Sequence, residues 1–98
     1  MPLKIHFSPL AKAQLLALTD HVRTEWGTRS AMKLNAKISS TLDQIAINPE
    51  MYPSTIVQQN VRRCVLNKQT TIYYRTSKEA IQILTLFDTR QDPDDLKF

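Results

Sequence analysis

The chain has few of the residues that build disulfide frameworks, metal clusters and flexible linkers. It contains one cysteine, Cys64, and one glycine, Gly27, among 98 residues. A single cysteine cannot form an intrachain disulfide, and together with two separated histidines, His6 and His21, it offers no metal-ligand spacing. We therefore expect no disulfide, no metal and no other cofactor. The length predicts one domain over residues 1–98, without a flexible linker.

Long apolar runs are also missing. The N-terminal residues MPLKIHFSPL contain no apolar stretch long enough for a signal peptide or a membrane span. The single cysteine fits a reducing compartment. On these grounds we expect a cytoplasmic protein.

Acidic residues are absent from one long stretch of a chain whose formal net charge is +4. Between Met51 and Lys78 there are five basic residues and no acidic one: Arg62, Arg63, Lys68, Arg75 and Lys78. A basic surface of this kind favours phosphate backbones or an acidic protein partner. The alternative is a solvated rim that only keeps the protein soluble.

The N-terminal half predicts a short strand followed by two helices. Leu3–Phe7 alternates apolar and polar residues, as a half-buried strand does. Ser8 and Pro9 then form a helix start, with Ser8 as N-cap and Pro9 at the first helical position. The first helix spans Pro9–Trp26, and Gly27 follows where a left-handed C-terminal cap favours glycine.

The second helix is predicted to start at a cap formed by Thr28 or Ser30 and to end at Asn48-Pro49. The short connection favours an antiparallel helical hairpin. Each helix carries one apolar stripe of helical period. The stripes are Ala11, Leu15, Leu18, Val22 and Trp26 in the first helix, and Ala31, Leu34, Ile38, Leu42 and Ile45 in the second.

The C-terminal half predicts a three-stranded antiparallel meander, with strands at Val61–Leu66, Thr70–Thr76 and Ala80–Asp88. Residues 50–60 form a loop. The tail, residues 89–98, is polar, and the sequence leaves open whether it lies along the sheet or is disordered until a partner binds. The predicted fold is therefore α+β with the order βααβββ. An N-terminal strand and a helical hairpin pack on one face of a mostly antiparallel sheet, and the other face is partly open for a partner.

The most specific segment reads RRCVLNKQTTIYYRTSKEAIQILTLFDTRQDP, after an opening of KIHFSPLAKAQLLAL. With this order of elements, the chain resembles the RelE/ParE superfamily of bacterial type II toxins. The match includes a basic strand, a strand with the aromatic–arginine pair Tyr74-Arg75, and an apolar strand that ends in an arginine-containing tail. The resemblance covers nearly the whole chain.

The resemblance implies one of two activities. RelE-like members cut mRNA in the ribosomal A site, whereas ParE-like members inhibit DNA gyrase and are not nucleases. Both are neutralised by an antitoxin encoded beside them, whose C-terminal segment wraps the toxin in a hetero-oligomer. A third reading is a non-toxic relic that binds only its antitoxin.

The nuclease pattern is incomplete in this chain. Its lysine pair falls on Arg62 and Cys64, its next arginine on Thr71, and its C-terminal tyrosine near Leu96, while the arginine after the last strand is matched by Arg90. These departures favour the ParE-like branch, which requires no catalytic residue. If the chain were a nuclease, it would be a metal-independent endoribonuclease whose phosphate-holding residues are Arg62, Arg75 and Arg90.

Six residues are the candidates for binding a target: Arg62, Arg63, Lys68, Tyr73, Arg75 and Arg90. Strand alternation predicts that Arg62 and Arg75 share one sheet surface and that Arg63 points to the other. Tyr73 and Tyr74 fall on opposite faces, so that one lies in the core and the other is available for presentation. For Arg90 the alternative is an ion pair with Asp88 or Asp92.

Overall fold

A computed structural model describes residues 2–55 and 60–96. Its helices and strands follow the predicted order, and their bounds, apart from the start of the second helix, lie within one residue of the predicted ones; the final short turn was not predicted. They are β1 (Lys4–Phe7), α1 (Pro9–Trp26), α2 (Thr28–Ile47), β2 (Val61–Val65), β3 (Thr70–Thr76), β4 (Ala80–Asp88) and a short 3-10 turn, η1 (Pro93–Asp95). The α+β fold class is confirmed.

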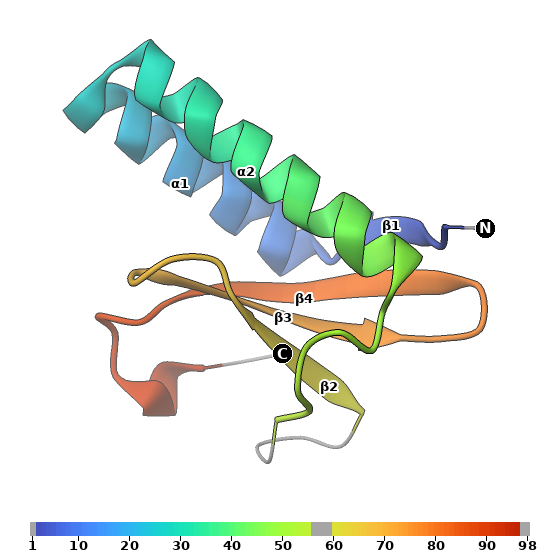
Figure 1. Ribbon diagram of the computed structural model, residues 1–98. Helices are drawn as coiled ribbons and strands as arrows, with labels where there is room; N and C mark the ends of the chain where they lie inside the picture. Colours follow the sequence, from blue (N-terminus) through green and yellow to red (C-terminus); the bar gives the residue numbers. More distant parts are fainter. Residues whose placement is uncertain (1, 56–59, 97–98) are drawn as a thin grey trace.

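The strands form one sheet in the order β1-β4-β3-β2, in which β1 runs parallel to β4 and the other pairs are antiparallel. Figure 1 shows both helices above this sheet and the C-terminal segment below it. The sheet is therefore a platform with two different faces, one covered by the helical hairpin and one covered in part by the chain's own tail.

Local sequence signals explain where α1 begins. The Ser8 hydroxyl oxygen accepts the N–H of Ala11 at 3.0 Å, so the predicted N-cap is confirmed. The same hydroxyl donates to the C=O of Leu84 at 2.7 Å, which ties the start of α1 to β4. One side chain thus caps a helix and joins it to the sheet.

The link between the helices differs from the prediction. Gly27 is the only residue between α1 and α2. Its φ is positive, at 96°, but its ψ of 170° is extended, so it is not a left-handed cap. The expected side-chain cap at Thr28 or Ser30 is wrong, because α2 starts directly at Thr28 with no side-chain cap hydrogen bond. A backbone that reverses within one residue leaves no position outside the helix for such a cap.

Most of the predicted apolar stripes lie against the sheet. The main core cluster contains Ala11 from α1, three stripe residues of α2 and the inward side chains of β2, β3 and β4. Trp26 is the exception, because it is 74% exposed. In Figure 1 the end of the hairpin near Gly27 rises away from the sheet, so a side chain there has no sheet beneath it.

A second, smaller cluster lies on the opposite face of the sheet. It consists of Val61, Tyr73, Leu84 and Phe87, with Leu96 packed against it. A β-bulge determines which β4 residues lie on each face of the sheet. The register shows it, because Tyr73 pairs with Thr85 but Tyr74 pairs with Ile83. Leu84 is therefore an extra residue in β4, and the residue parity that faces the helices changes across it.

Among the described helices, none combines the length and the apolar character that a membrane span requires.

Candidate functional site

The face of the sheet away from the helices carries two of the predicted cations. Arg63 lies opposite Tyr73 in the β2–β3 register, and Arg75 lies opposite Val61. Both partners belong to the cluster on this face. Arg63 is exposed and Arg75 is half-buried. This face therefore presents two guanidinium groups beside an apolar cluster, a combination that suits a protein surface with acidic side chains.

Arg62 does not share that face. It lies opposite Tyr74, which is fully buried on the helix side, and its Nη1 donates to the C=O of Tyr52 at 2.7 Å. The prediction that Arg62 and Arg75 share one sheet face, with Arg63 on the other, is therefore wrong. Arg63 shares the open face with Arg75, and Arg62 lies on the helix side. The reason is Cys64, because its burial on the helix side fixes Arg62 on that side by strand alternation.

Lys68 and Arg90 lie at one end of the sheet. Lys68 is exposed in the β2–β3 hairpin, where its C=O accepts the Thr89 hydroxyl at 2.6 Å. Thr89 also donates its N–H to the C=O of Gln69 at 2.9 Å. These bonds bring the hairpin next to the turn that follows β4. The five predicted cations thus occupy the open face, the helix-side margin and one sheet end, rather than one continuous patch.

Arg90 forms the ion pair that the sequence left as an alternative. Its Nε and Nη2 donate to the Asp88 carboxylate oxygens at 3.0 and 2.8 Å. The hydrogen bonds from Arg90 lower the pKa of the Asp88 carboxyl, and the same pairing raises the pKa of Arg90. The side chains remain 62% and 36% exposed for Arg90 and Asp88, so the pair contributes little to stability. Its main effect is to neutralise the cation.

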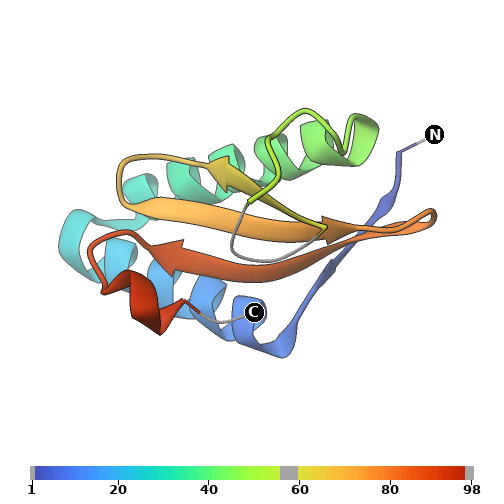
Figure 2. The ribbon, with the colours of Figure 1, turned by 90° about the horizontal axis from the view of Figure 1, so that it is seen from below.

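Tyr73 is not presented to a partner. It is only 7% exposed, because it belongs to the cluster that Leu96 covers. Leu96 is positioned by η1, where the Asp92 carboxylate accepts the N–H of Asp94 at 2.9 Å. Figure 2, seen from below, shows this segment beside the arrowhead of β4 and in front of α1. The candidate role of Tyr73 in direct binding is therefore incompatible with this arrangement of the tail.

The positions of the nuclease pattern do not come together as a catalytic site. Cys64 is fully buried on the helix side and Thr71 is 4% exposed. On β2, the positions facing the open side are Val61, Arg63 and Val65, which supply one charge in place of a lysine pair. Leu96 has no proton to transfer. A general acid and a cluster of phosphate-binding cations are both needed for RNA cleavage by the 2′-OH.

Buried phenol and thiol groups on the helix side are structural. The Tyr74 hydroxyl donates to the C=O of Pro49 at 3.0 Å, and burial raises the pKa of Tyr74 to about 12. Burial also raises the pKa of the Cys64 thiol. Both groups are therefore protonated at neutral pH, which removes the thiolate that a nucleophile would need. In residues 2–55 and 60–96, no three His, Cys, Asp or Glu side chains gather as metal ligands would.

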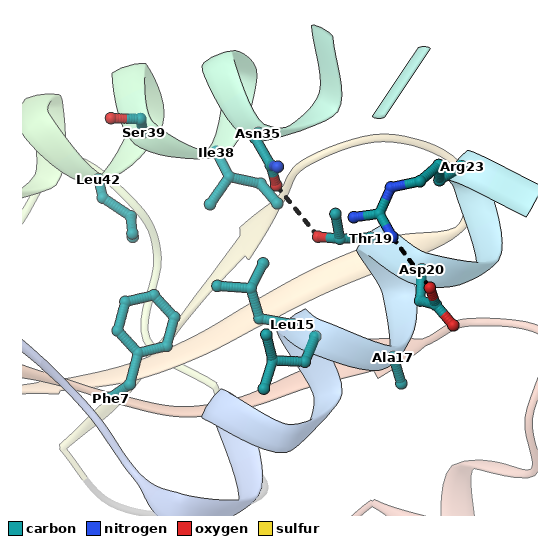
Figure 3. Close-up of a pocket in the computed structure, with 11 residues that line it drawn as sticks. Phe7, Leu15, Ala17, Thr19, Asp20, Arg23, Asn35, Ile38, Ser39 and Leu42 are labelled. Atoms are coloured by element: carbon teal, nitrogen blue, oxygen red, sulfur yellow. Dashed lines mark hydrogen bonds and ion pairs between the residues drawn. The ribbon is translucent and has the colours of Figure 1, made fainter. Parts of the chain in front are cut away.

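One concave site was not predicted from the sequence. A groove of about 800 Å³ lies between α1 and α2, with an apolar floor and a polar rim. Figure 3 shows Phe7, Leu15, Ile38 and Leu42 along the floor. At the rim, the Thr19 hydroxyl donates to Asn35 Oδ1 at 3.1 Å, which bridges the helices. The only sequence signal was Leu16, an apolar residue outside the stripe, which is 67% exposed beside the groove.

Comparisons with known proteins agree with this fold. The profile of a family described as "ParE toxin of type II toxin-antitoxin system, parDE" matches residues 5–93. No curated protein sequence matches the chain.

Solved structures with the same fold include a chain of the chromosomal ParDE toxin–antitoxin system from P. aeruginosa. It is 20% identical with a TM-score of 0.73, over 88% of this chain and 95% of that one. A YoeB dimer from Staphylococcus aureus is 17% identical with a TM-score of 0.63, over 89% and 97%. A chain of the E. coli DinJ–YafQ toxin–antitoxin complex is 8% identical with a TM-score of 0.62, over 92% and 96%.

Proposed function

The chain belongs to the ParE toxin family and is the toxin component of a type II toxin–antitoxin system, and from this premise we propose that it stops growth by binding and inhibiting DNA gyrase. The match over residues 5–93 carries the proposal, because it covers both the helical hairpin and the whole meander. Binding requires a complementary surface but no catalytic residue.

Two structural observations support a binding activity over RNA cleavage. The positions that would supply a second lysine and an arginine to a nuclease are Cys64 and Thr71, and both are buried. Arg90, the remaining matched cation, is paired with Asp88. By contrast, Arg63 and Arg75 flank an apolar cluster on a face that the helices leave uncovered. We assign that face as the contact with gyrase.

A supercoiling assay tests this proposal. Purified gyrase and relaxed plasmid are incubated with the toxin, and we expect supercoiling to stop and linear DNA to accumulate as toxin is added. Relaxation of the same plasmid by a type I topoisomerase serves as the control and should be unaffected. Unchanged supercoiling at a stoichiometric excess of folded toxin overturns the assignment of gyrase.

Two other outcomes identify the alternative activities. Toe-printing on a translated message reports cleavage in the ribosomal A site, and cuts there would assign the RelE-like nuclease activity. Induced expression of the chain alone reports toxicity. Growth that continues unchanged despite soluble, folded protein would identify a relic that binds only its antitoxin.

We further propose that a small protein encoded next to this chain neutralises it. Two of the similar structures are described as a toxin–antitoxin system and a toxin–antitoxin complex. The α1–α2 groove, with its apolar floor of Phe7, Leu15 and Ile38, is a suitable seat for an apolar segment of such a partner. Co-expression tests the pairing, since the neighbour's product should restore growth and co-purify with the toxin.

A further inference from the structure

Half of strand β4 has no neighbouring strand on its outer edge. β1 pairs only with Ala80–Ile83, and β4 continues to Asp88. In Figure 2, β1 crosses beside the start of β4 and is distant from its arrowhead. Unpaired strand edges expose N–H and C=O groups that can pair with another chain.

The register shows which backbone groups point outward. Ile72 and Thr70 direct their hydrogen-bonding groups toward β2, as the bond from Leu66 N–H to the Thr70 C=O at 3.0 Å indicates. Their partners in β4, Leu86 and Asp88, are therefore non-hydrogen-bonded pairs with β3 and direct their own groups to the outer edge.

Two of these four outward groups are satisfied within the chain. The Leu86 N–H donates to Gln14 Oε1 at 2.8 Å, and the Asp88 C=O accepts the N–H of Gln91 at 3.0 Å. The Leu86 C=O and the Asp88 N–H remain, with no partner among residues 2–55 and 60–96. In a parallel sheet, one residue of a strand bonds to the C=O of one neighbour residue and to the N–H of the residue two positions later. The Leu86 C=O and the Asp88 N–H have this spacing.

The remaining groups border a cleft of about 520 Å³ between α1 and the end of β4. Leu18 and Val22 form its apolar wall on α1, facing Leu86. Amide side chains lie around it: Gln14, Gln69 and Gln91. Its charges are mixed, because Glu25 and Asp88 are accompanied by His21 and Arg90. A site with an apolar wall, amides and no dominant charge fits an uncharged peptide.

We propose that this cleft binds an extended, uncharged segment of the antitoxin, which adds to β4 as a parallel strand in line with β1. One residue of the segment, placed opposite Phe87, donates its N–H to the Leu86 C=O and accepts the Asp88 N–H. An aliphatic side chain of the segment contacts Leu18 and Val22. The inference rests on the proposed pairing with an antitoxin.

The position of α1 explains why the antitoxin is the occupant. Ala17 lines both this cleft and the α1–α2 groove, so the two hollows are separated only by the exposed ridge of α1. A segment seated in the groove can cross α1 at this small side chain and continue into the cleft. A chain that is extended and unfolded alone gains most from backbone pairing, because the strand edge supplies its missing hydrogen bonds.

Amide hydrogen exchange of the toxin, free and bound to the neighbour's product, tests the inference at one atom. The Asp88 N–H points outward, so we expect fast exchange in the free toxin and at least tenfold slower exchange in the complex. The Phe87 N–H points into the β3–β4 ladder and is the internal control, slow in both states. A complex that forms while Asp88 exchanges as fast as before overturns the inference and leaves the proposed function intact.

A pair of variants at the same position gives an independent measurement. Asp88→Pro removes the outward N–H, which β3 does not use, and proline is tolerated on a strand edge in this orientation. Asp88→Ala loses the same carboxylate but keeps the N–H. We expect Asp88→Pro to bind the antitoxin at least about fivefold more weakly than Asp88→Ala, the effect of one lost hydrogen bond.

Equal affinities of the two folded variants overturn the inference. Circular dichroism and thermal unfolding establish that both are folded, and if Asp88→Pro is not, the exchange experiment on the unmodified toxin decides alone. If the neighbour's product does not bind the toxin at all, the proposed antitoxin pairing fails and the inference fails with it.

Discussion

The side-chain oxygen of Gln14 accepts the backbone N–H of Leu86 at 2.8 Å, and so joins the middle of α1 to the edge of β4. The same oxygen accepts the hydroxyl of Thr85 at 3.0 Å. Both β4 residues are buried, so their donors have no ready access to water. Beyond the end of β1, the side-chain amide of Gln14 thus supplies the acceptor that a neighbouring strand would otherwise provide to the Leu86 N–H.

Replacing Gln14 by Ala should therefore lower the free energy of unfolding by about 1–3 kcal/mol, because two buried donors lose their acceptor. Gln14→Glu keeps an oxygen at this position and is the matched control, with a smaller loss expected. Urea unfolding followed by circular dichroism measures both. Equal losses in the two variants would show that the contact stabilises by packing alone.

Gly27 provides a second test. Its φ of 96° is unfavourable for any residue with a Cβ, although no atom lies within 4 Å of where a Cβ would be. Gly27→Ala should therefore destabilise by about 1–2 kcal/mol through backbone strain alone. For a chain of this size, that lowers Tm by about 4–16 °C.

The neighbouring position is the control for this substitution. Thr28 makes no side-chain cap hydrogen bond, so Thr28→Ala should change the free energy of unfolding by less than about 0.5 kcal/mol. Ser8→Ala removes a real cap and should cost about 1 kcal/mol. Thermal unfolding of the three variants gives the order directly, and a large loss in Thr28→Ala would contradict it.

The Asp88–Arg90 pair predicts a pH dependence at the acidic end. The pKa of Asp88 is lowered in the folded protein from an ordinary value of 3.8. The stabilisation is therefore fully present above about pH 4 and is lost as the pH falls through the lowered pKa. Wild type should be slightly more stable than Asp88→Asn at pH 6, with a difference that vanishes at lower pH.

Denaturant midpoints of the two proteins between pH 6 and pH 2 measure this difference. Arg90→Gln removes the guanidinium and should reduce the same pH dependence, while the backbone N–H of residue 90 still donates to the Asp88 carboxylate. A difference between wild type and Asp88→Asn that persists unchanged to pH 2 would show that ionisation of Asp88 is not involved.

The open face predicts a functional effect of charge. The double variant Arg63→Glu and Arg75→Glu should weaken inhibition of gyrase by about tenfold, with a smaller effect at high salt, because charges at an interface rim act on association. Lys33→Glu with Lys37→Glu changes the net charge equally on exposed positions of α2 and is the control. Supercoiling titrations give both values, and equal losses would assign the effect to net charge.

The fold was predictable because its signals are local. Ser8 and Pro9 mark the start of α1, Gly27 marks its end, and the strands follow a period of two with polar turns between them. The parallel pairing of β1 with β4 is compatible with this order, but it is set by packing of the hairpin over the sheet.

The site was less predictable, for reasons visible in particular residues. Arg62 and Arg63 are adjacent and both basic, so charge could not tell which one faces the helices, and only the burial of Cys64 decides it. Leu96 packs against the cluster that contains Tyr73. It is a single leucine in a polar tail without hydrophobic periodicity, so no pattern in the sequence predicts this contact. The groove and the cleft depend on how the helices cross the sheet, a property that sequence patterns do not encode.

The bulge at Leu84 reverses which residues of β4, odd-numbered or even-numbered, face the helices. Ahead of it, odd-numbered residues such as Ile81 and Ile83 belong to the helix-side core, and after it the even-numbered Leu86 does. A regular β4 of unchanged length would turn Leu86 outward and Phe87 toward α1, and the amide of Gln14 would meet the wrong neighbour, whereas deletion of Leu84 alone would keep both residues on their present faces. Insertions should be tolerated better in the turn at residues 77–79, where a longer loop leaves the β3–β4 register unchanged.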